Sequence, residues 1–210
     1  MNYKGVIFDL DGVICFTDRY HYQAWKMIAD EINVYFDEKI NNRLRGVSRM
    51  ESLDIILERS EKVYTLAEKE VLADRKNECY KKLLNQMTPK DLDDEVKFTM
   101  DELKKKGCRL AIGSSSKNAK LILNRIGLEG YFDAISDGTN ITHSKPNPEV
   151  FLKAAEFLGL LPEECLVVED AVAGIDAAIA GGFPCAGIGE AAKYEKADYS
   201  LNTFSDLLNI

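Results

Sequence analysis

The sequence predicts an α/β protein built on a doubly wound parallel sheet, with a helical cap domain inserted after the first strand. From residue 93 onward, short apolar runs alternate with amphipathic stretches of helix length, which is typical of parallel strands joined by crossover helices. Between the first apolar strand and residue 93 this strand pattern is absent, and the stretch is far too long for a loop. A chain of 210 residues can hold such a main domain and a smaller insertion.

The strands expected in the main domain are short and apolar, as in sheets that are buried on both faces. The first covers residues 4–9, and the others lie near 109–113, 133–136, 165–168 and 184–188. Helices are expected at 94–106, 117–127, 148–159 and 171–181. We therefore predict a Rossmann-like core formed by residues 1–15 and 93–210.

The inserted segment, residues 16–92, has a helical pattern throughout. Two capping boxes mark helix starts within it, Ser48 with Glu51 and Thr65 with Glu68. Further helices are expected at 18–32 and 37–44.

The composition excludes several classes of partner. With 27 basic and 35 acidic residues the net charge is −8, so no overall positive field attracts nucleic acid or an anionic membrane surface. Nowhere do eighteen apolar residues follow one another, and the apolar run at 5–8 is too short for a signal peptide. We expect a protein of the cytoplasm, without nucleic acid or membrane partners.

The cysteines agree with a reducing compartment. There are five, an odd number with no C-x-x-C pair, which argues against a disulfide framework and against a zinc cluster.

Two aspartates, Asp9 and Asp11, stand two residues apart where the first strand ends. Their side chains therefore leave the strand on the same face. In open parallel sheets ligands bind at the carboxyl edge, which favours a functional site. The alternative is a solvated Asp-Gly turn.

A second acidic pair, Glu169-Asp170, ends the strand at 165–168 and reaches the same edge. Converging carboxylates repel one another unless a cation lies between them, and oxygen ligands favour Mg²⁺. The chain has only two histidines, His21 and His143, so a nitrogen-rich site is not expected. The alternative is that Asp170 caps the following helix.

A phosphate site is predicted from two further segments. The run Ser114-Ser115-Ser116-Lys117-Asn118 links a strand to a helix and offers hydroxyl and backbone N–H groups of the kind that bind phosphate. Lys145 precedes another helix and would supply positive charge beside the carboxylates. A polar linker and a surface lysine are the alternatives.

Together these segments predict phosphoryl transfer through a covalent intermediate. One aspartate would attack phosphorus to form an acyl phosphate, which divides one difficult displacement into two easier ones. Mg²⁺ and Lys145 would offset the charge on the phosphoryl oxygens.

These motifs resemble those of the haloacid dehalogenase superfamily, which Asp9-Leu10-Asp11-Gly12, Ser114, Lys145 and Glu169-Asp170 match in order. The cap is similar to that of the β-phosphoglucomutase subfamily. The residues that carry this second resemblance are Tyr20 to Trp25, Gly46 to Arg49, Arg75 to Asn77, and Ser116 to Asn118.

The resemblance implies that Asp9 is phosphorylated and that Asp11 shuttles a proton. It implies that Ser114 and Lys145 hold the transferred phosphate. The metal ligands it implies are Asp9, the backbone carbonyl of Asp11, Glu169 and Asp170.

The resemblance also implies a second phosphate site for a bisphosphorylated sugar, with Arg49 as its cationic residue in the cap. The predicted substrate-binding residues are His21, Gly46, Val47, Arg49, Lys76, Ser115, Ser116, Lys117 and Asn118. Two positions depart from the subfamily pattern: Phe16 replaces a polar residue and Ala171 a hydroxyl residue.

The expected function is a sugar-phosphate mutase that interconverts β-D-glucose 1-phosphate and glucose 6-phosphate through glucose 1,6-bisphosphate, as a monomer. One alternative is a Mg²⁺-dependent phosphatase of the same superfamily acting on a small phosphorylated metabolite. Another is a signalling receiver domain, which also surrounds an acceptor aspartate with carboxylates. The inserted cap argues against a receiver domain.

Overall fold

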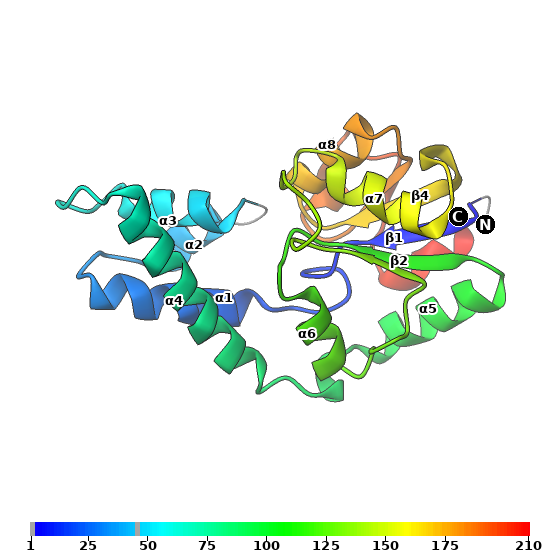
Figure 1. Cartoon of the computed structure of the whole chain (residues 1–210). Coiled ribbons are helices and arrows are strands. Elements are labelled where there is room, and N and C mark those ends of the chain that lie inside the picture. Colours follow the sequence, from blue (N-terminus) through cyan, green and yellow to red (C-terminus); the bar gives the residue numbers. More distant parts are fainter. Residues whose placement is uncertain (1–2, 45–46) are drawn as a thin grey trace. The chain divides into compact units, whose positions relative to one another are not determined.

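The computed structural model describes residues 3–44 and 47–210. The chain forms two compact units (Figure 1). The sheet unit comprises Met1–Phe16 and Thr88–Ile210, and the helical unit comprises Thr17–Met87. The segment 88–92 was predicted to be part of the cap, but it groups with the sheet unit and contains the 3₁₀ helix η1 (Pro89–Asp91).

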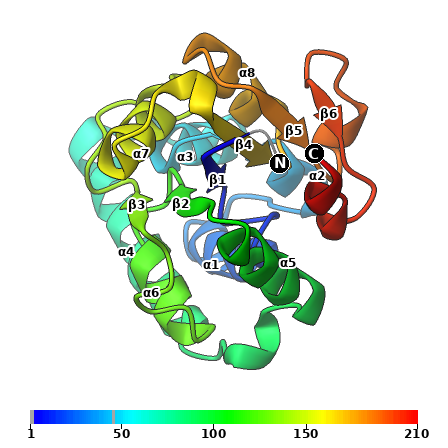
Figure 2. The same ribbon diagram turned by 90° about the vertical axis from the view of Figure 1, so that its right-hand side faces the viewer.

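The sheet has six parallel strands in the order β3-β2-β1-β4-β5-β6 (Figure 2), which confirms the predicted doubly wound fold. The last strand, β6, was not predicted because two residues carry no recognisable pattern. The strands are β1 (Gly5–Phe8), β2 (Arg109–Gly113), β3 (Ala134–Ser136), β4 (Cys165–Glu169), β5 (Cys185–Gly187) and β6 (Tyr199–Ser200).

Helices cover both faces of the sheet. In Figures 1 and 2, α7 and α8 lie on one face and α5 lies on the other. The α-helices of this unit are α5 (Asp94–Lys105), α6 (Ala119–Arg125), α7 (Glu149–Leu158) and α8 (Val172–Ala180), and its remaining 3₁₀ helices are η2 (Pro162–Glu164), η3 (Ala191–Lys193) and η4 (Phe204–Asn209).

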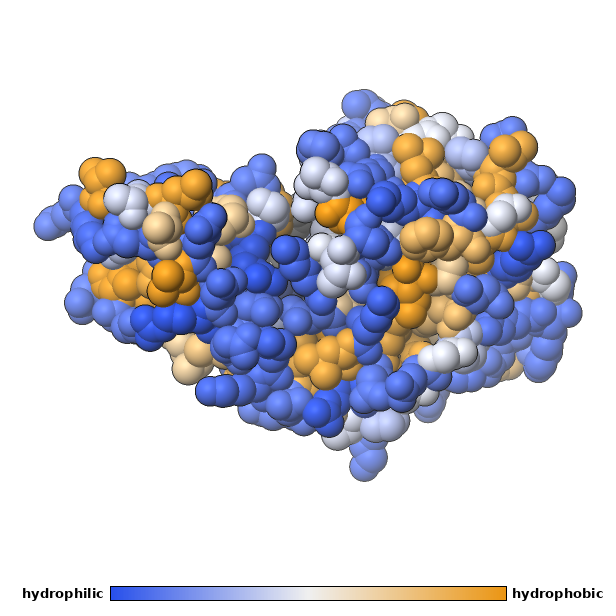
Figure 3. Space-filling view, viewed as in Figure 1, coloured by the Kyte–Doolittle hydropathy of each residue, from blue (hydrophilic) through white to orange (hydrophobic). Residues whose placement is uncertain are grey.

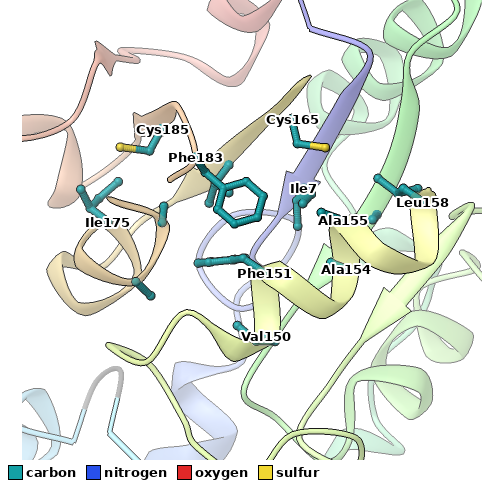
Figure 4. Close-up of a cluster of buried hydrophobic side chains, with 14 of the residues drawn as sticks. Ile7, Val150, Phe151, Ala154, Ala155, Leu158, Cys165, Ile175, Phe183 and Cys185 are labelled. Carbon is teal, nitrogen blue, oxygen red and sulfur yellow. The ribbon is translucent and has the colours of Figure 1, made fainter. Parts of the chain in front are cut away.

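Between α7 and the sheet lies a core of buried apolar side chains (Figure 4). Ile7 of β1 and Phe151 of α7 are completely buried, and the ring of Phe151 packs edge to face on that of Phe183. Burial of these apolar side chains holds the helix layer on the sheet and keeps the strand ends in fixed positions.

The central strand β1 fixes where the polar residues emerge. Phe8 is paired in register with Ile112 of β2 on one side and with Val168 of β4 on the other. The residues that follow these three strands therefore meet at one edge of the sheet, at the point where the strand order reverses. Ligands bind at this point in open α/β sheets.

The helical unit consists of α1 (Asp18–Glu31), α2 (Glu38–Asn42), α3 (Arg49–Leu57) and α4 (Leu66–Leu84). Both predicted capping boxes are present, at the starts of α3 and α4. The unit has its own core, in which the buried side chains include Trp25, Ile28, Leu53, Ile56 and Leu72.

On the face drawn in Figure 3, hydrophobic residues form separate patches among hydrophilic ones. None of the helices described combines the length and apolar character that a membrane span requires. All five cysteines are free thiols.

Candidate active site

Asp9 follows β1 and lies at the centre of the candidate site. Its backbone N–H donates to the carbonyl of Val168 at 2.9 Å, which continues the pairing of β1 with β4. Its carboxylate is buried and accepts a hydrogen bond from Lys145 Nζ at 2.5 Å. The same ammonium donates to Glu169 Oε1 at 2.5 Å. Lys145 thus bridges two carboxylates that come from different strand ends.

Charge pairing keeps the buried Lys145 protonated. Burial alone would lower the pKa of its ammonium, but the adjacent carboxylates of Asp9 and Glu169 outweigh burial and raise the pKa above its usual value. The lysine therefore carries a fixed positive charge at the position where a phosphoryl group would need one.

Three carboxylates converge here and are suited to a metal ion. Asp9, Glu169 and Asp170 each place an oxygen within 4.8 Å of the others. Burial, together with repulsion from the neighbouring carboxylates, raises the pKa of Asp170 to about 8. The pKa of Glu169 rises to about 7, mainly through burial and despite Lys145. An all-oxygen donor set whose members repel one another fits a hard divalent cation such as Mg²⁺.

These raised pKa values predict how the stability of the metal-free protein depends on pH. The folded protein binds the protons of Glu169 and Asp170 more tightly than the unfolded chain does. Their contribution to stability is fully present below the usual pKa values of 4.5 and 3.8, and it is lost as the pH rises through about 7 and about 8. Mg²⁺ should therefore raise the unfolding temperature more at high pH than at low pH.

Thermal unfolding at pH 6 and pH 8, in EDTA and in excess Mg²⁺, measures this difference. The same series on Asp170→Asn is the control. The amide does not titrate, so the difference between the Mg²⁺-induced rises in unfolding temperature at pH 6 and pH 8 should shrink. An equal Mg²⁺ effect at both pH values would contradict the assignment of the cluster.

Asp11 lies two residues after Asp9 and is half-buried. Between Asp11 and the first cap residue the chain turns tightly at Gly12, whose φ of +97° favours glycine. A side chain at Gly12 would also meet Asp170, since its Cβ would lie 2.1 Å from Asp170 Oδ2. The glycine of the Asp9-Leu10-Asp11-Gly12 motif therefore makes room for the Asp170 carboxylate of the acidic cluster.

The predicted phosphate loop follows β2 and is organised by its own hydroxyls. Ser114 is buried, and its Oγ accepts from the backbone N–H of Ser116 at 3.2 Å. Ser116 Oγ accepts in turn from the N–H of Asn118 at 3.2 Å. Ser115 Oγ lies 3.5 Å from the backbone nitrogen of Lys145, so this loop adjoins the acidic cluster.

Lys117 completes the loop and is exposed. Within the described part of the chain, its ammonium has no carboxylate partner. The loop therefore offers a solvent-accessible cation next to ordered hydroxyl and amide groups, which suits a phosphate.

In the helical unit, His21 and Lys76 lie together. Lys76 Nζ is 2.8 Å from His21 Nδ1, and the ammonium lies over the rings of Trp25 and Tyr80 at 5.0 and 4.5 Å. Burial, with the positive charges of Lys76 and Arg49, lowers the pKa of His21 well below its usual value. His21 is therefore neutral at pH 7.

Tyr80 is not among the site residues predicted from the sequence. Its ring stacks against His21 with centroids 4.1 Å apart, and its hydroxyl donates to Thr17 Oγ1 at 2.9 Å. No local pattern indicates this role, because the contacts join the beginning of α1 to the far half of α4.

Arg49 begins α3, is half-buried and donates from Nη2 to Asn77 Oδ1 at 2.9 Å. Val47 precedes it and is exposed. Gly46, also predicted to bind substrate, lies outside the described residues.

At one edge of the sheet the structure brings together the buried carboxylate of Asp9, the ammonium of Lys145, an acidic cluster and a hydroxyl-rich loop. This arrangement is suited to phosphoryl transfer. A model of the haloacid dehalogenase-like hydrolase family matches residues 3–182, and the chain belongs to this family.

Within the family the chain is similar to β-phosphoglucomutases. It is 43% identical to the β-phosphoglucomutase of Bacillus subtilis over 206 residues, which cover 97% of this chain and 91% of that protein. The crystal structure of β-phosphoglucomutase from Clostridium difficile matches with a TM-score of 0.90 and 37% identity, covering 98% and 93% of the two chains. Fructose-1-phosphate phosphatase YqaB of Escherichia coli is 33% identical to this chain over 181 residues, which cover 86% of this chain and 93% of that phosphatase.

Proposed function

We propose that the protein is a β-phosphoglucomutase, which interconverts β-D-glucose 1-phosphate and glucose 6-phosphate through glucose 1,6-bisphosphate. The observation that carries the proposal is the contact of Lys145 with Asp9 and Glu169, because a buried carboxylate beside a paired ammonium is what a residue that accepts a phosphoryl group requires. The 43% identity to a β-phosphoglucomutase over nearly the whole chain supports the mutase over the phosphatase, whose named representative is 33% identical.

In the proposed reaction, phosphorylated Asp9 passes its phosphoryl group to the 6-hydroxyl of glucose 1-phosphate, and Asp11 accepts the hydroxyl proton. The bisphosphate then turns round, so that Asp9 takes the phosphoryl group from the C1 oxygen. Asp11 returns its proton to that oxygen, and glucose 6-phosphate leaves. Each cycle regenerates the phosphorylated enzyme without consuming water.

Lys145 and Ser114 are proposed to hold the phosphoryl group during both transfers. Mg²⁺, held by Asp9, Asp170 and the backbone carbonyl of Asp11 with Glu169 beside them, would neutralise charge on the phosphoryl oxygens. The Lys145 ammonium donates to both Glu169 and Asp9, so Glu169 would help to hold it beside the proposed nucleophile.

A mutase differs from a phosphatase because it must also hold the phosphate that is not reacting. The proposed ligands for this distal phosphate are Arg49 in the helical unit and the loop of Ser116, Lys117 and Asn118 in the sheet unit. Burial lowers the pKa of Arg49 below its usual value, but its guanidinium is still protonated at neutral pH and has the fork geometry that phosphate favours. The remaining proposed substrate-binding residues are His21, Gly46, Val47, Lys76 and Ser115.

One assay tests the function directly. The protein is given β-glucose 1-phosphate, Mg²⁺ and a trace of glucose 1,6-bisphosphate, and both glucose 6-phosphate and free phosphate are measured. The mutase predicts glucose 6-phosphate with little free phosphate. Stoichiometric free phosphate would instead identify a phosphatase.

Replacing Arg49 by alanine should weaken sugar phosphate turnover selectively. Loss of one charged contact to phosphate corresponds to roughly 2 kcal/mol, or a fall of about 30-fold in kcat/KM for glucose 1-phosphate. Slow hydrolysis of acetyl phosphate should not change, because that substrate has no distal phosphate.

The matched control is Arg43→Ala in the same unit, since the Arg43 side chain is half exposed and pairs with Glu58 at 2.7 Å. It should leave both activities unchanged. Equal loss of both activities in Arg49→Ala would show that Arg49 does not serve a distal phosphate.

The site of action is proposed to be the cytoplasm, where the free thiols would stay reduced. A monomeric state remains a prediction, which the molar mass in solution would test.

A further inference from the structure

Two glycines, Gly12 and Gly174, lie against the acidic pair Glu169-Asp170. The backbone conformation requires glycine at only one of these two positions. Gly12 adopts a φ of +97°, which other residues rarely do. Gly174 lies in the first turn of α8, and its φ is outside the left-handed region. Alanine is favoured over glycine in helices, by up to about 1 kcal/mol in helix interiors, so Gly174 needs another reason.

That reason is space. A Cβ atom at position 174 would lie 1.9 Å from Cδ and 2.0 Å from Oε1 of Glu169. The third nearest atom, at 2.5 Å, is also from Glu169, so a methyl group would compete first with this one side chain. The backbone of α8 could remain as it is while the carboxylate is displaced.

The Glu169 carboxylate cannot move without losing its partners. It is buried, Oε1 accepts from Lys145 Nζ at 2.5 Å, and Oε2 accepts from the N–H of Ala171 at 3.1 Å. Displacement would break the contact with Lys145 and take one member out of the carboxylate cluster.

We propose that Gly174 is a positioning residue. Because it has no side chain, it leaves the space in which the Glu169 carboxylate lies against Lys145 and beside the proposed metal site. The inference rests on the proposed Mg²⁺ site, and it adds a residue that touches neither substrate nor metal. This role explains why α8 has a glycine at position 174, although the backbone conformation there does not require one.

A double-mutant cycle tests the proposal by measuring Mg²⁺ binding calorimetrically. Gly174→Ala should raise the Mg²⁺ dissociation constant at least about tenfold, as expected when a group supporting a metal site is lost. In a Glu169→Ala background, where the displaced carboxylate is absent, the same substitution should change the dissociation constant less than about twofold. An equal change in both backgrounds, or no change in either, would overturn the proposal.

Urea unfolding in EDTA provides a second measurement that needs no metal. Gly174→Ala should lower the urea midpoint in the parent chain, because it separates Glu169 from Lys145. In the Glu169→Ala background it should leave the midpoint unchanged or raise it, as helix propensity alone requires. A fall of the same size in both backgrounds would mean that Gly174 acts on folding in general.

Gly182→Ala is the matched control, because its φ is +77° and a Cβ there would meet nothing within 4 Å. Backbone strain should lower its urea midpoint while Mg²⁺ binding stays unchanged. If the parent chain does not bind Mg²⁺, the proposed metal site fails, and the urea cycle alone then decides the role of Gly174.

Discussion

Asp9→Asn should abolish the conversion of glucose 1-phosphate, with a loss of at least about 1,000-fold in kcat. The amide has the size of the carboxylate and can still accept the hydrogen bond from Lys145 Nζ, so the fold should survive. It cannot act as the nucleophile that takes up the phosphoryl group. A coupled assay for glucose 6-phosphate measures the loss, and circular dichroism checks the fold.

Asp101→Asn on α5 is the control for removing a carboxylate, since Asp101 pairs with Lys97 at the surface. Such surface substitutions change stability by about 0.5 kcal/mol or less, and activity should be unaffected. Retention of full activity by Asp9→Asn would exclude Asp9 as the phosphorylated residue.

Lys145→Met should reduce both the stability and the activity of the protein. Methionine fills a similar volume but leaves the buried carboxylates of Asp9 and Glu169 without their ammonium. Breaking a buried ion pair from one side costs about 3 kcal/mol or more in unfolding free energy. Urea unfolding in EDTA measures this cost, and added Mg²⁺ should recover part of it by neutralising the same carboxylates.

Lys153→Met on α7 is the matched control. Its ammonium is partly exposed and lies 3.7 Å from Glu149, so the pair should contribute less than about 1 kcal/mol. If Lys145→Met were as stable as Lys153→Met, the Lys145 ammonium would not be needed to neutralise the buried carboxylates of Asp9 and Glu169.

The elements that the sequence predicts well are those with local signals. The capping boxes at Ser48 and Thr65 are encoded within four residues each, and both are present. The apolar runs of β1, β2 and β4 are long enough to be recognised, whereas β6 consists of two residues. Because parallel strands align their carboxyl ends, the strand runs also predict that Asp9 and Glu169 come together.

Contacts that depend on tertiary packing could not be predicted. Tyr80 contacts Thr17 and His21 only because α1 packs on α4, and a tyrosine at helical spacing resembles any core aromatic. The need for glycine at position 174 arises from the rotamer of Glu169, which depends in turn on Lys145 from a distant loop. This requirement for glycine depends on the relative positions of three segments, which carry Gly174, Glu169 and Lys145, and no local sequence pattern encodes those positions.

Phosphorylation of Asp9 can be measured directly. The protein is incubated with glucose 1,6-bisphosphate and Mg²⁺, quenched in acid, digested, and analysed by tandem mass spectrometry. One phosphoryl group should be found on the peptide that contains Asp9 and be assigned to that residue, and the Asp9→Asn variant treated in the same way should carry none. A phosphoryl group on another residue, or an unmodified Asp9 peptide from an enzyme that turns over, would contradict the mechanism.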